Sequence, residues 1–254
     1  MTLLNALYGL FVLPESLSRE RRRAFAWRRA NPVGSLRLLR SHPDLLGIAS
    51  VSFLYYLAHH VLASVFVLYA GYRYGWGETT VGLTLAAVGI CNIAVQGGLV
   101  HPVVARFGER RTLLVALFFG AVGFAIYGLA PTGTAFWLGI PVFSLIKLYS
   151  PAAQGLMTQR VGSSEQGQLQ GANSSIMGIT GLFGPVPFTL TFASFIGARR
   201  TWHLPGAPFQ LAAALMLVAV TLAWRVTRPR REPSSAGRRQ AAELSAPRRP
   251  STSR

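Results

Sequence analysis

The sequence predicts an all-α membrane protein with six transmembrane helices, and three observations lead to this fold class. Hydrophobic residues make up 51% of the 254 residues, whereas only 13% are charged. The apolar residues gather in long blocks, and several blocks reach the roughly 20 residues that a helix needs to cross the hydrocarbon core at about 1.5 Å per residue. The arginines, finally, lie mostly between these blocks.

Six spans are predicted, each bounded by charge, glycine or proline. They cover Leu45–Tyr72, Thr79–Ala105, Thr112–Ala130, Thr134–Gln159, Gln168–Ala198 and Leu204–Trp224. Together they form a six-helix transmembrane bundle over residues 44–224.

Three further segments flank the bundle. Residues 1–13 are apolar but too short to span, and they lack the basic start and cleavage site of a secretion signal, so we expect the end of a helix whose beginning is missing. Residues 14–43 form a basic loop. Residues 225–254 are rich in Pro, Ser, Ala and Arg with few large apolar side chains, which predicts a disordered basic tail.

The net charge of +17 comes almost entirely from arginine, since Lys147 is the only lysine. With the basic loop inside and the connectors alternating, the cytoplasmic side holds eight arginines of that loop, Arg106, Arg110, Arg111, Arg160 and nine arginines from Arg225 onward. The opposite side holds only Arg73, Arg199 and Arg200. Cytoplasmic loops carry an excess of basic residues, so we expect the central loop and the tail to be cytoplasmic. Membrane lipid, and not nucleic acid, is the expected partner of the tail.

The second and third spans are joined by a basic turn that reads Pro102-Val-Val-Ala-Arg106-Phe-Gly108-Glu109-Arg110-Arg111. Gly108 can take a positive φ there, and the arginines can bond helix-end carbonyls, acidic groups or lipid phosphates. The turn resembles the loop signature of the major facilitator superfamily, in the copy between the eighth and ninth helices.

A second motif, Gln166-Gly167-Gln168-Leu169-Gln170-Gly171, is followed by Gly184-Pro185 and Phe188-Thr189. With Pro151-Ala152 and Gln154 upstream, it resembles the tetracycline-efflux branch of that superfamily, whose eleventh helix opens with the same string. The segment Asn5–Leu17 looks like the end of the family's sixth helix, and Asn31-Pro32-Val33 looks like its central loop. The resemblance extends over nearly the whole chain.

This resemblance implies what the chain is part of. Family members have twelve helices in two pseudo-symmetric halves around a central cavity, so the chain would carry helices seven to twelve, the C-terminal half, preceded by a stub of helix six. It implies a drug:proton antiporter of a bacterial inner membrane. The implied partners are a small-molecule, tetracycline-like substrate, protons and the missing N-terminal half.

Lys147 is the leading candidate for the transport pathway, because an ionisable group inside a span is expensive and is a functional hypothesis by default. It either meets an anionic substrate or a carboxylate on the absent half, or it is a snorkelling or pairing lysine. Asn92 and Gln96, one turn apart, are neutral hydrogen-bonding candidates for the cavity or for a contact between helices.

His59 and His60 lie in the first full span, one turn after Tyr55 and Tyr56. A histidine can couple protons because its pKa is near neutrality. Adjacent residues point about 100° apart on a helix, so at most one histidine faces a given site. The simpler interpretation is a histidine bonded to a neighbouring helix or placed in the lipid interface.

Two positions depart from the family. A gapless match from Gly108-Glu109-Arg110-Arg111 places Gly120 where the ninth helix of tetracycline exporters carries an aspartate important for proton-coupled export. Asn92 likewise falls where those proteins have a histidine of the eighth helix. Both changes remove a titratable group, which argues against tetracycline as the substrate and against the family's usual proton route.

The span from Gln168 to Ala198 contains Gly171, Gly178, Gly181 and Gly184, followed by Pro185. Small residues permit close helix packing, and proline permits a kink. In a transporter that rocks between two states, such a close and bendable interface also serves alternating access.

The sequence does not predict an enzyme or a bound cofactor. It has no nucleotide-binding glycine-rich loop with its lysine, no cluster with metal-ligand spacing and no nucleophile with a suitable frame. The alternatives to a transporter half are a stand-alone membrane protein or half-transporter subunit that dimerises, and a non-functional truncation. A membrane-anchored nucleic-acid binder would rest on the basic tail alone.

Overall fold

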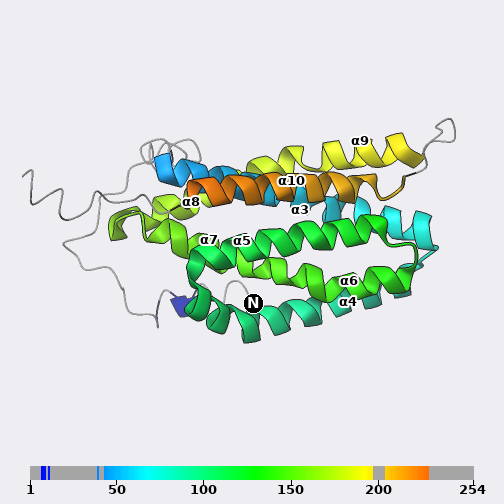
Figure 1. The fold of residues 1–254 in the computed structure, drawn as a ribbon, viewed down its shortest axis with the longest axis horizontal. Helices are drawn as coiled ribbons and strands as arrows, with labels where there is room; N and C mark the ends of the chain where they lie inside the picture. The colour runs from blue at the N-terminus through cyan, green and yellow to red at the C-terminus, as the bar shows by residue number, and fades with distance from the viewer. Residues whose placement is uncertain (1–6, 10, 12–38, 40–42, 197–203, 229–254) are drawn as a thin grey trace, which may run out of the picture.

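The computed structural model describes residues 7–9, 11, 39, 43–196 and 204–228. Most of the predicted helix end at 1–13 and of the basic loop at 14–43 lies outside these residues, as do Arg199, Arg200 and the tail from residue 229. Within the described residues the chain is helical and its long helices run along the longest axis of the molecule (Figure 1).

The helices follow each other through short connections. In order they are α3 (Pro43–Tyr74), α4 (Glu78–Ala94), the π-helix η2 (Val95–Leu99), α5 (Val100–Leu129), α6 (Gly133–Ser144), the 3₁₀ segment η3 (Leu145–Leu148), α7 (Tyr149–Thr158), the 3₁₀ turn η4 (Ser163–Glu165), α8 (Gln166–Phe183), α9 (Pro185–Ile196) and α10 (Ala207–Val226). Several predicted spans are therefore interrupted helices and not single regular ones.

The described residues contain five helices that are long and apolar enough to cross a membrane, where the sequence predicts six spans. The difference lies in one continuous run, Glu78–Leu129, of 52 residues. A straight helix of this length would measure about 78 Å, against a hydrocarbon core of about 30 Å. Gly108 interrupts the run with φ 74° and ψ 163°, and the chain doubles back there (Figure 1). The count of six, which takes the two arms separately, stays a prediction.

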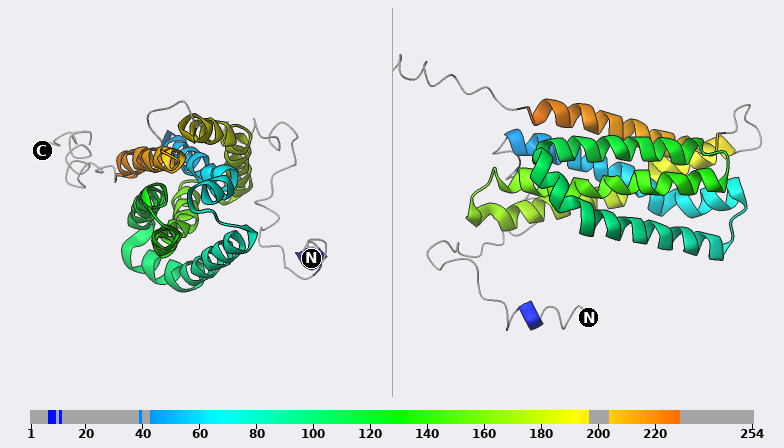
Figure 2. Two further views of the ribbon diagram at one scale, coloured as in Figure 1. Left: turned by 90° about the vertical axis from the view of Figure 1, so that its right-hand side faces the viewer. Right: turned by 60° about the horizontal axis from the view of Figure 1, so that its bottom comes forward.

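Helix α10 packs against both α3 and α5, and α8 and α9 cover another side of α3. Helix α4 packs against α6 (Figure 2). Glycines allow the closest approaches: a Cβ on Gly206, at the start of α10, would overlap the Gly128 carbonyl of α5. A Cβ on Gly123 would lie 2.7 Å from the Cα atom of Phe143 in α6. Contact between backbones replaces side-chain interdigitation at these crossings, as is common between membrane helices.

Buried aromatic rings fill one end of the bundle. The Tyr127 ring stacks on Phe136 at 4.1 Å between centroids, and Phe209 of α10 packs edge-on to Tyr69 at 4.9 Å. The hydroxyl of Tyr69 donates a hydrogen bond to the Tyr127 carbonyl oxygen at 2.9 Å, and that of Tyr74 to the Ala130 carbonyl oxygen at 2.9 Å. These bonds satisfy carbonyls at the C-terminal end of α5 that have no partner within the helix.

The other end of the bundle holds the basic turn. Glu109 of the turn accepts a hydrogen bond from Gln159 after α7 at 2.9 Å, and the Arg110 Nε atom donates to the hydroxyl of Thr227 after α10 at 3.2 Å. Three chain reversals or helix ends therefore meet at one end. The arginines described there are Arg106, Arg110, Arg111, Arg160, Arg225 and Arg228. Among the described arginines only Arg73, in the last turn of α3, belongs to the opposite end.

Candidate functional site

Two interrupted spans meet near the middle of the bundle. The π-helix η2, which contains Gly97 and Gly98, is in contact with the 3₁₀ segment η3. A Cβ on either glycine would meet nothing within 4 Å, so close packing does not require glycine here. The two glycines instead give the backbone a wider choice of conformations. Both π-bulges and 3₁₀ stretches inside longer helices are frequent at functional sites and hinges.

Prolines explain why the helix α6–η3–α7 is interrupted. Pro141 lies inside α6 and Pro151 near the start of α7, and neither can donate a backbone hydrogen bond. The bond missing at Pro151 is the one an α-helix would make to the carbonyl of Lys147. Irregular backbone at membrane depth is tolerated where it is buried in protein or lines a cavity, so η3 marks such a place.

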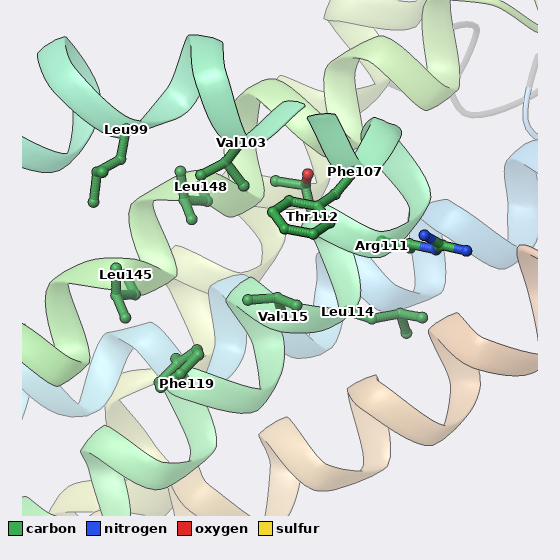
Figure 3. A pocket seen from close by; sticks show the side chains of 10 residues that line it. All are labelled: Leu99, Val103, Phe107, Arg111, Thr112, Leu114, Val115, Phe119, Leu145 and Leu148. Atoms are coloured by element: carbon green, nitrogen blue, oxygen red, sulfur yellow. The ribbon is translucent and has the colours of Figure 1, made fainter. Parts of the chain in front are cut away.

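The residues of η3 point in three directions, because a 3₁₀ helix has three residues per turn. Leu145 and Leu148 point into an apolar groove of about 490 Å³ between η2, α5 and η3 (Figure 3). Ile146 faces α5, since its Cδ1 atom lies 2.6 Å from where a Cβ on Gly120 would be. Lys147 takes the third direction, is half-buried, and lies within electrostatic range of His59 on α3.

No ion pair of Lys147 is present among the described residues. The acidic side chains described there are Glu78 at the start of α4, Glu109, which is bonded to Gln159, and Glu165, which closes the turn at Gly162. Lys147 is 11 residues from the end of the span Gly133–Thr158, or about 16 Å along a helix. The cation therefore lies at membrane depth without a described counter-charge.

An aromatic column fixes the position of η3 against α3. The Tyr149 ring, directly after η3, stacks on Tyr55 at 3.8 Å, and its hydroxyl donates to the Ser52 Oγ atom at 2.8 Å. The column continues from Tyr55 to His59 at 5.5 Å and from His59 to Phe143 at 5.9 Å, both stacked. The His59 Nδ1 atom is buried within it and has no hydrogen-bond partner.

His60 faces another direction, toward α8 and α9. Its ring lies against Gly184, where a Cβ would be 2.6 Å from the His60 Cδ2 atom, and it is 3.8 Å from a Cβ on Gly181. Tyr56, on the same helix, is hydrogen-bonded to Asn173 of α8, whose Nδ2 atom donates to the Tyr56 hydroxyl at 3.2 Å. The two histidines thus belong to different contacts of α3.

The glycines of the predicted flexible span are not equivalent. Gly184 is buried at the junction of α8 and α9, directly before Pro185, and packs on His60. Gly178 is exposed and a Cβ there would meet nothing, while the carbonyl of Gly171 accepts a hydrogen bond from Ser175 at 2.7 Å. Among Gly178, Gly181 and Gly184, the close contact with another helix is that of Gly184.

Asn92 and Gln96 do not form a shared polar site. The Asn92 Oδ1 atom is buried without a hydrogen-bond partner. Gln96 is exposed, and its amide donates only to the Asn92 backbone carbonyl at 3.4 Å. At Gly120 any side chain would displace Ile146, so the close packing of η3 on α5 requires a glycine at this position.

Gly108 of the basic turn has the positive φ expected for it. Arg106 and Arg111 are exposed, and Arg111 lies at one edge of the apolar groove in Figure 3. Arg110 and Glu109 make the bonds to Thr227 and Gln159 described above.

A family model for the Major Facilitator Superfamily matches residues 1–185. The chain belongs to this superfamily. Membership makes it a multi-pass integral membrane protein of a transporter family and not an enzyme, as the sequence predicts.

The predicted likeness to tetracycline-efflux proteins is confirmed by two relatives. Tetracycline resistance protein, class C, of Escherichia coli is 31% identical over 220 residues, which cover 85% of this chain and 53% of that protein. The class G protein of Vibrio anguillarum is 33% identical over 177 residues, with coverages of 68% and 44%. The chain spans about half the length of the curated relatives it matches.

A more distant relative and a solved structure extend the comparison. Hippocampus abundant transcript-like protein 1 of Mus musculus is 27% identical over 242 residues, covering 88% of this chain and 48% of that protein. The crystal structure of the human organic anion transporter MFSD10 (TETRAN) matches with a TM-score of 0.71 at 20% identity, over 87% of this chain and 54% of that one. This likeness shows that the helices adopt the superfamily fold.

Four residues of the site were not identified from the sequence, namely Gly97, Gly98, Tyr149 and Ser52. The Gly97-Gly98 pair inside a predicted span is a recognisable signal for an interrupted helix, since glycine pairs and π-bulges cause kinks. The bond from Tyr149 to Ser52 joins residues far apart in the chain, and no local sequence pattern announces it.

Proposed function

We propose that this chain is the C-terminal half of a proton-coupled efflux transporter for small amphipathic molecules. In this proposal it lies in a bacterial inner membrane, with the central loop and the tail in the cytoplasm. The observation that carries the proposal is the contact between the interrupted segments η2 and η3 within the spans of a superfamily member. Transporters of several folds build their midplane sites from discontinuous helices of this kind.

The direction of transport rests on the relatives. Both tetracycline resistance proteins named above match more than two thirds of the chain. The orientation is supported by the arginines, six of which the fold gathers at the end that holds the basic turn. Tetracycline itself is not part of the proposal, because Gly120 packs on Ile146 where the resemblance would place an aspartate.

The half-transporter part of the proposal is supported by the coverage of about half of each relative and by polar groups that the spans do not bury completely, namely the exposed Gln96 and the half-buried Lys147. Polar groups at membrane depth face a bundle interior or a wet cavity, which a second half would enclose.

The proposal is tested in everted membrane vesicles from bacteria that express the chain alone or with a separately encoded N-terminal half of the class C relative. Accumulation of a panel of fluorescent amphipathic compounds is measured under an imposed pH gradient, with a protonophore as the control. We expect accumulation only when the two halves co-purify, and loss of it with the protonophore. Co-purification without accumulation of any compound contradicts the proposal, and transport by the chain alone as a dimer supports the half-transporter alternative instead.

A further inference from the structure

The feature that the proposed function leaves unexplained is a cation without a counter-charge. Lys147 is half-buried in η3 at membrane depth, and the described acidic side chains are engaged or distant. Asp44, at the start of α3, lies 15 residues before His59, or about 22 Å along that helix. A charged side chain at this depth is costly unless it is paired.

The surroundings of Lys147 hold it in place instead of letting it reach the membrane surface. Tyr149, two residues later, is stacked on Tyr55 and bonded to Ser52, so the backbone of η3 is anchored to α3. Ile146 is anchored on the other side against Gly120. A lysine can extend toward the interface only by the length of its side chain, and about 16 Å of helix separate it from the end of the span.

The neighbouring groups supply hydrogen bonding and apolar surface but no negative charge. His59 lies in electrostatic range of Lys147 and is either neutral or positive, never a counter-ion. The backbone interruption at η3 is of the type that lines ligand cavities. The missing charge must therefore come from outside the described chain.

We propose that Lys147 is the recognition residue for an acidic group, so that the transported molecules are amphipathic anions such as carboxylates or sulfonates. This inference rests on the proposed transport function and names its substrate class. The ammonium group donates charge-assisted hydrogen bonds to the acidic oxygens, while the apolar body of the ligand lies against the bundle interior.

The test uses three fluorescent probes that share one apolar body: pyrenebutyrate, pyrenebutanol and pyrenebutylammonium. Their binding to the purified full chain in lipid nanodiscs is measured by fluorescence anisotropy. The variants are Lys147→Gln, Lys147→Arg and, as a control that removes one positive charge elsewhere, Arg225→Gln in the last turn of α10. Elution as a single folded species and an unchanged melting temperature verify that each variant is intact.

We expect the parent chain to bind the anionic probe most tightly. Loss of one charge-assisted hydrogen bond raises the dissociation constant of pyrenebutyrate about 10- to 100-fold in Lys147→Gln, and Lys147→Arg restores most of the affinity. The neutral probe binds equally to all variants, and the cationic probe binds at least as tightly to Lys147→Gln as to the parent chain because one like charge is removed. Arg225→Gln changes none of the dissociation constants. Equal binding of the three probes to the parent chain overturns the inference, and so does an unchanged dissociation constant of pyrenebutyrate in Lys147→Gln.

The same probes separate failure of this inference from failure of the proposed function. They are added to the transport panel with both halves present. Transport of only neutral or cationic compounds, unaffected by Lys147→Gln, overturns the anion proposal and leaves the transporter proposal standing. That result would assign Lys147 to a carboxylate of the other half. Absence of flux for every compound contradicts the transporter proposal itself, while selective binding of pyrenebutyrate would still support the anion site.

Discussion

Replacing Gly123 by alanine tests the close packing of α5 on α6. A Cβ at this position would lie 2.7 Å from both the Cα and the Cβ atoms of Phe143. Carbon atoms pack best at about 3.5–4.0 Å, so the two helices must separate by roughly 1 Å. A rotamer change of Phe143 alone cannot relieve the overlap, because one of the two contacts is with its backbone Cα atom.

The expected size of the effect follows from two opposed contributions. Overpacking costs about 1–3 kcal/mol, and alanine in place of glycine within a helix returns about 0.5–1 kcal/mol. The net loss lies between about 0 and 2.5 kcal/mol. At its midpoint, about 1 kcal/mol, it lowers the melting temperature of a chain of this size by about 2–4 °C.

Gly82→Ala in α4 is the matched control. It is the same exchange inside a helix, but nothing lies within 4 Å of the added Cβ. We expect its melting temperature to rise by about 1–4 °C. Both variants are compared with the parent chain in one detergent, at one heating rate, by fluorescence-detected size-exclusion chromatography. If Gly123→Ala is as stable as Gly82→Ala, the packing of α5 on α6 described above is wrong.

Three further substitutions probe individual contacts by the same assay. Tyr149→Phe removes the hydrogen bond to Ser52 and should lower the free energy of unfolding by about 1 kcal/mol. It should cause no further loss of stability when Ser52→Ala is already present, and additive losses would show that the two hydroxyls act independently. Thr227→Val should lower stability by about 0.5–1.5 kcal/mol because it removes the acceptor of the hydrogen bond from Arg110. Thr227→Ser keeps that hydroxyl and should keep the stability, and equal losses in both variants would assign the effect to packing. Gly184→Ala should cost about 1–3 kcal/mol because its Cβ meets both the Thr180 carbonyl oxygen and the His60 ring. His60→Ala should make the same exchange less costly by removing one of these two contacts, and an equal cost in both backgrounds would assign the whole loss to the Thr180 carbonyl.

The positions of the spans could be predicted because bilayer thickness fixes the length of an apolar helix. The arginine distribution reflects a physical bias of the same kind, and the described arginines other than Arg73 do gather at one end. The sharp reversal at Gly108 was likewise readable, since glycine readily takes a positive φ.

The interruptions within the spans were not predicted, because hydropathy does not register them. Val95–Leu99 and Leu145–Leu148 lie inside long apolar blocks despite Gln96 and Lys147, and their π and 3₁₀ geometry depends on glycine, proline and the opposing helix. Lys147 was identified from its charge alone, but its direction relative to Leu145, Leu148 and Ile146 required the three-dimensional packing.

Polar pairs along one helix proved a weaker guide. Asn92 and Gln96 are one turn apart, yet one oxygen is buried without a partner and the other side chain is exposed. The adjacent histidines did separate as helix geometry requires, with His59 in the aromatic column and His60 on Gly184.

The proposed coupling of small-molecule transport to a proton gradient is tested by measuring both fluxes in one experiment. The chain and an N-terminal half are reconstituted together into liposomes with a pH-sensitive dye inside. We expect added substrate to dissipate an imposed pH gradient and to accumulate in step with it, and we expect both signals to disappear when either half is omitted. Substrate movement that is independent of the gradient contradicts proton coupling, and a verified one-to-one assembly with no flux of any substrate contradicts the transporter proposal.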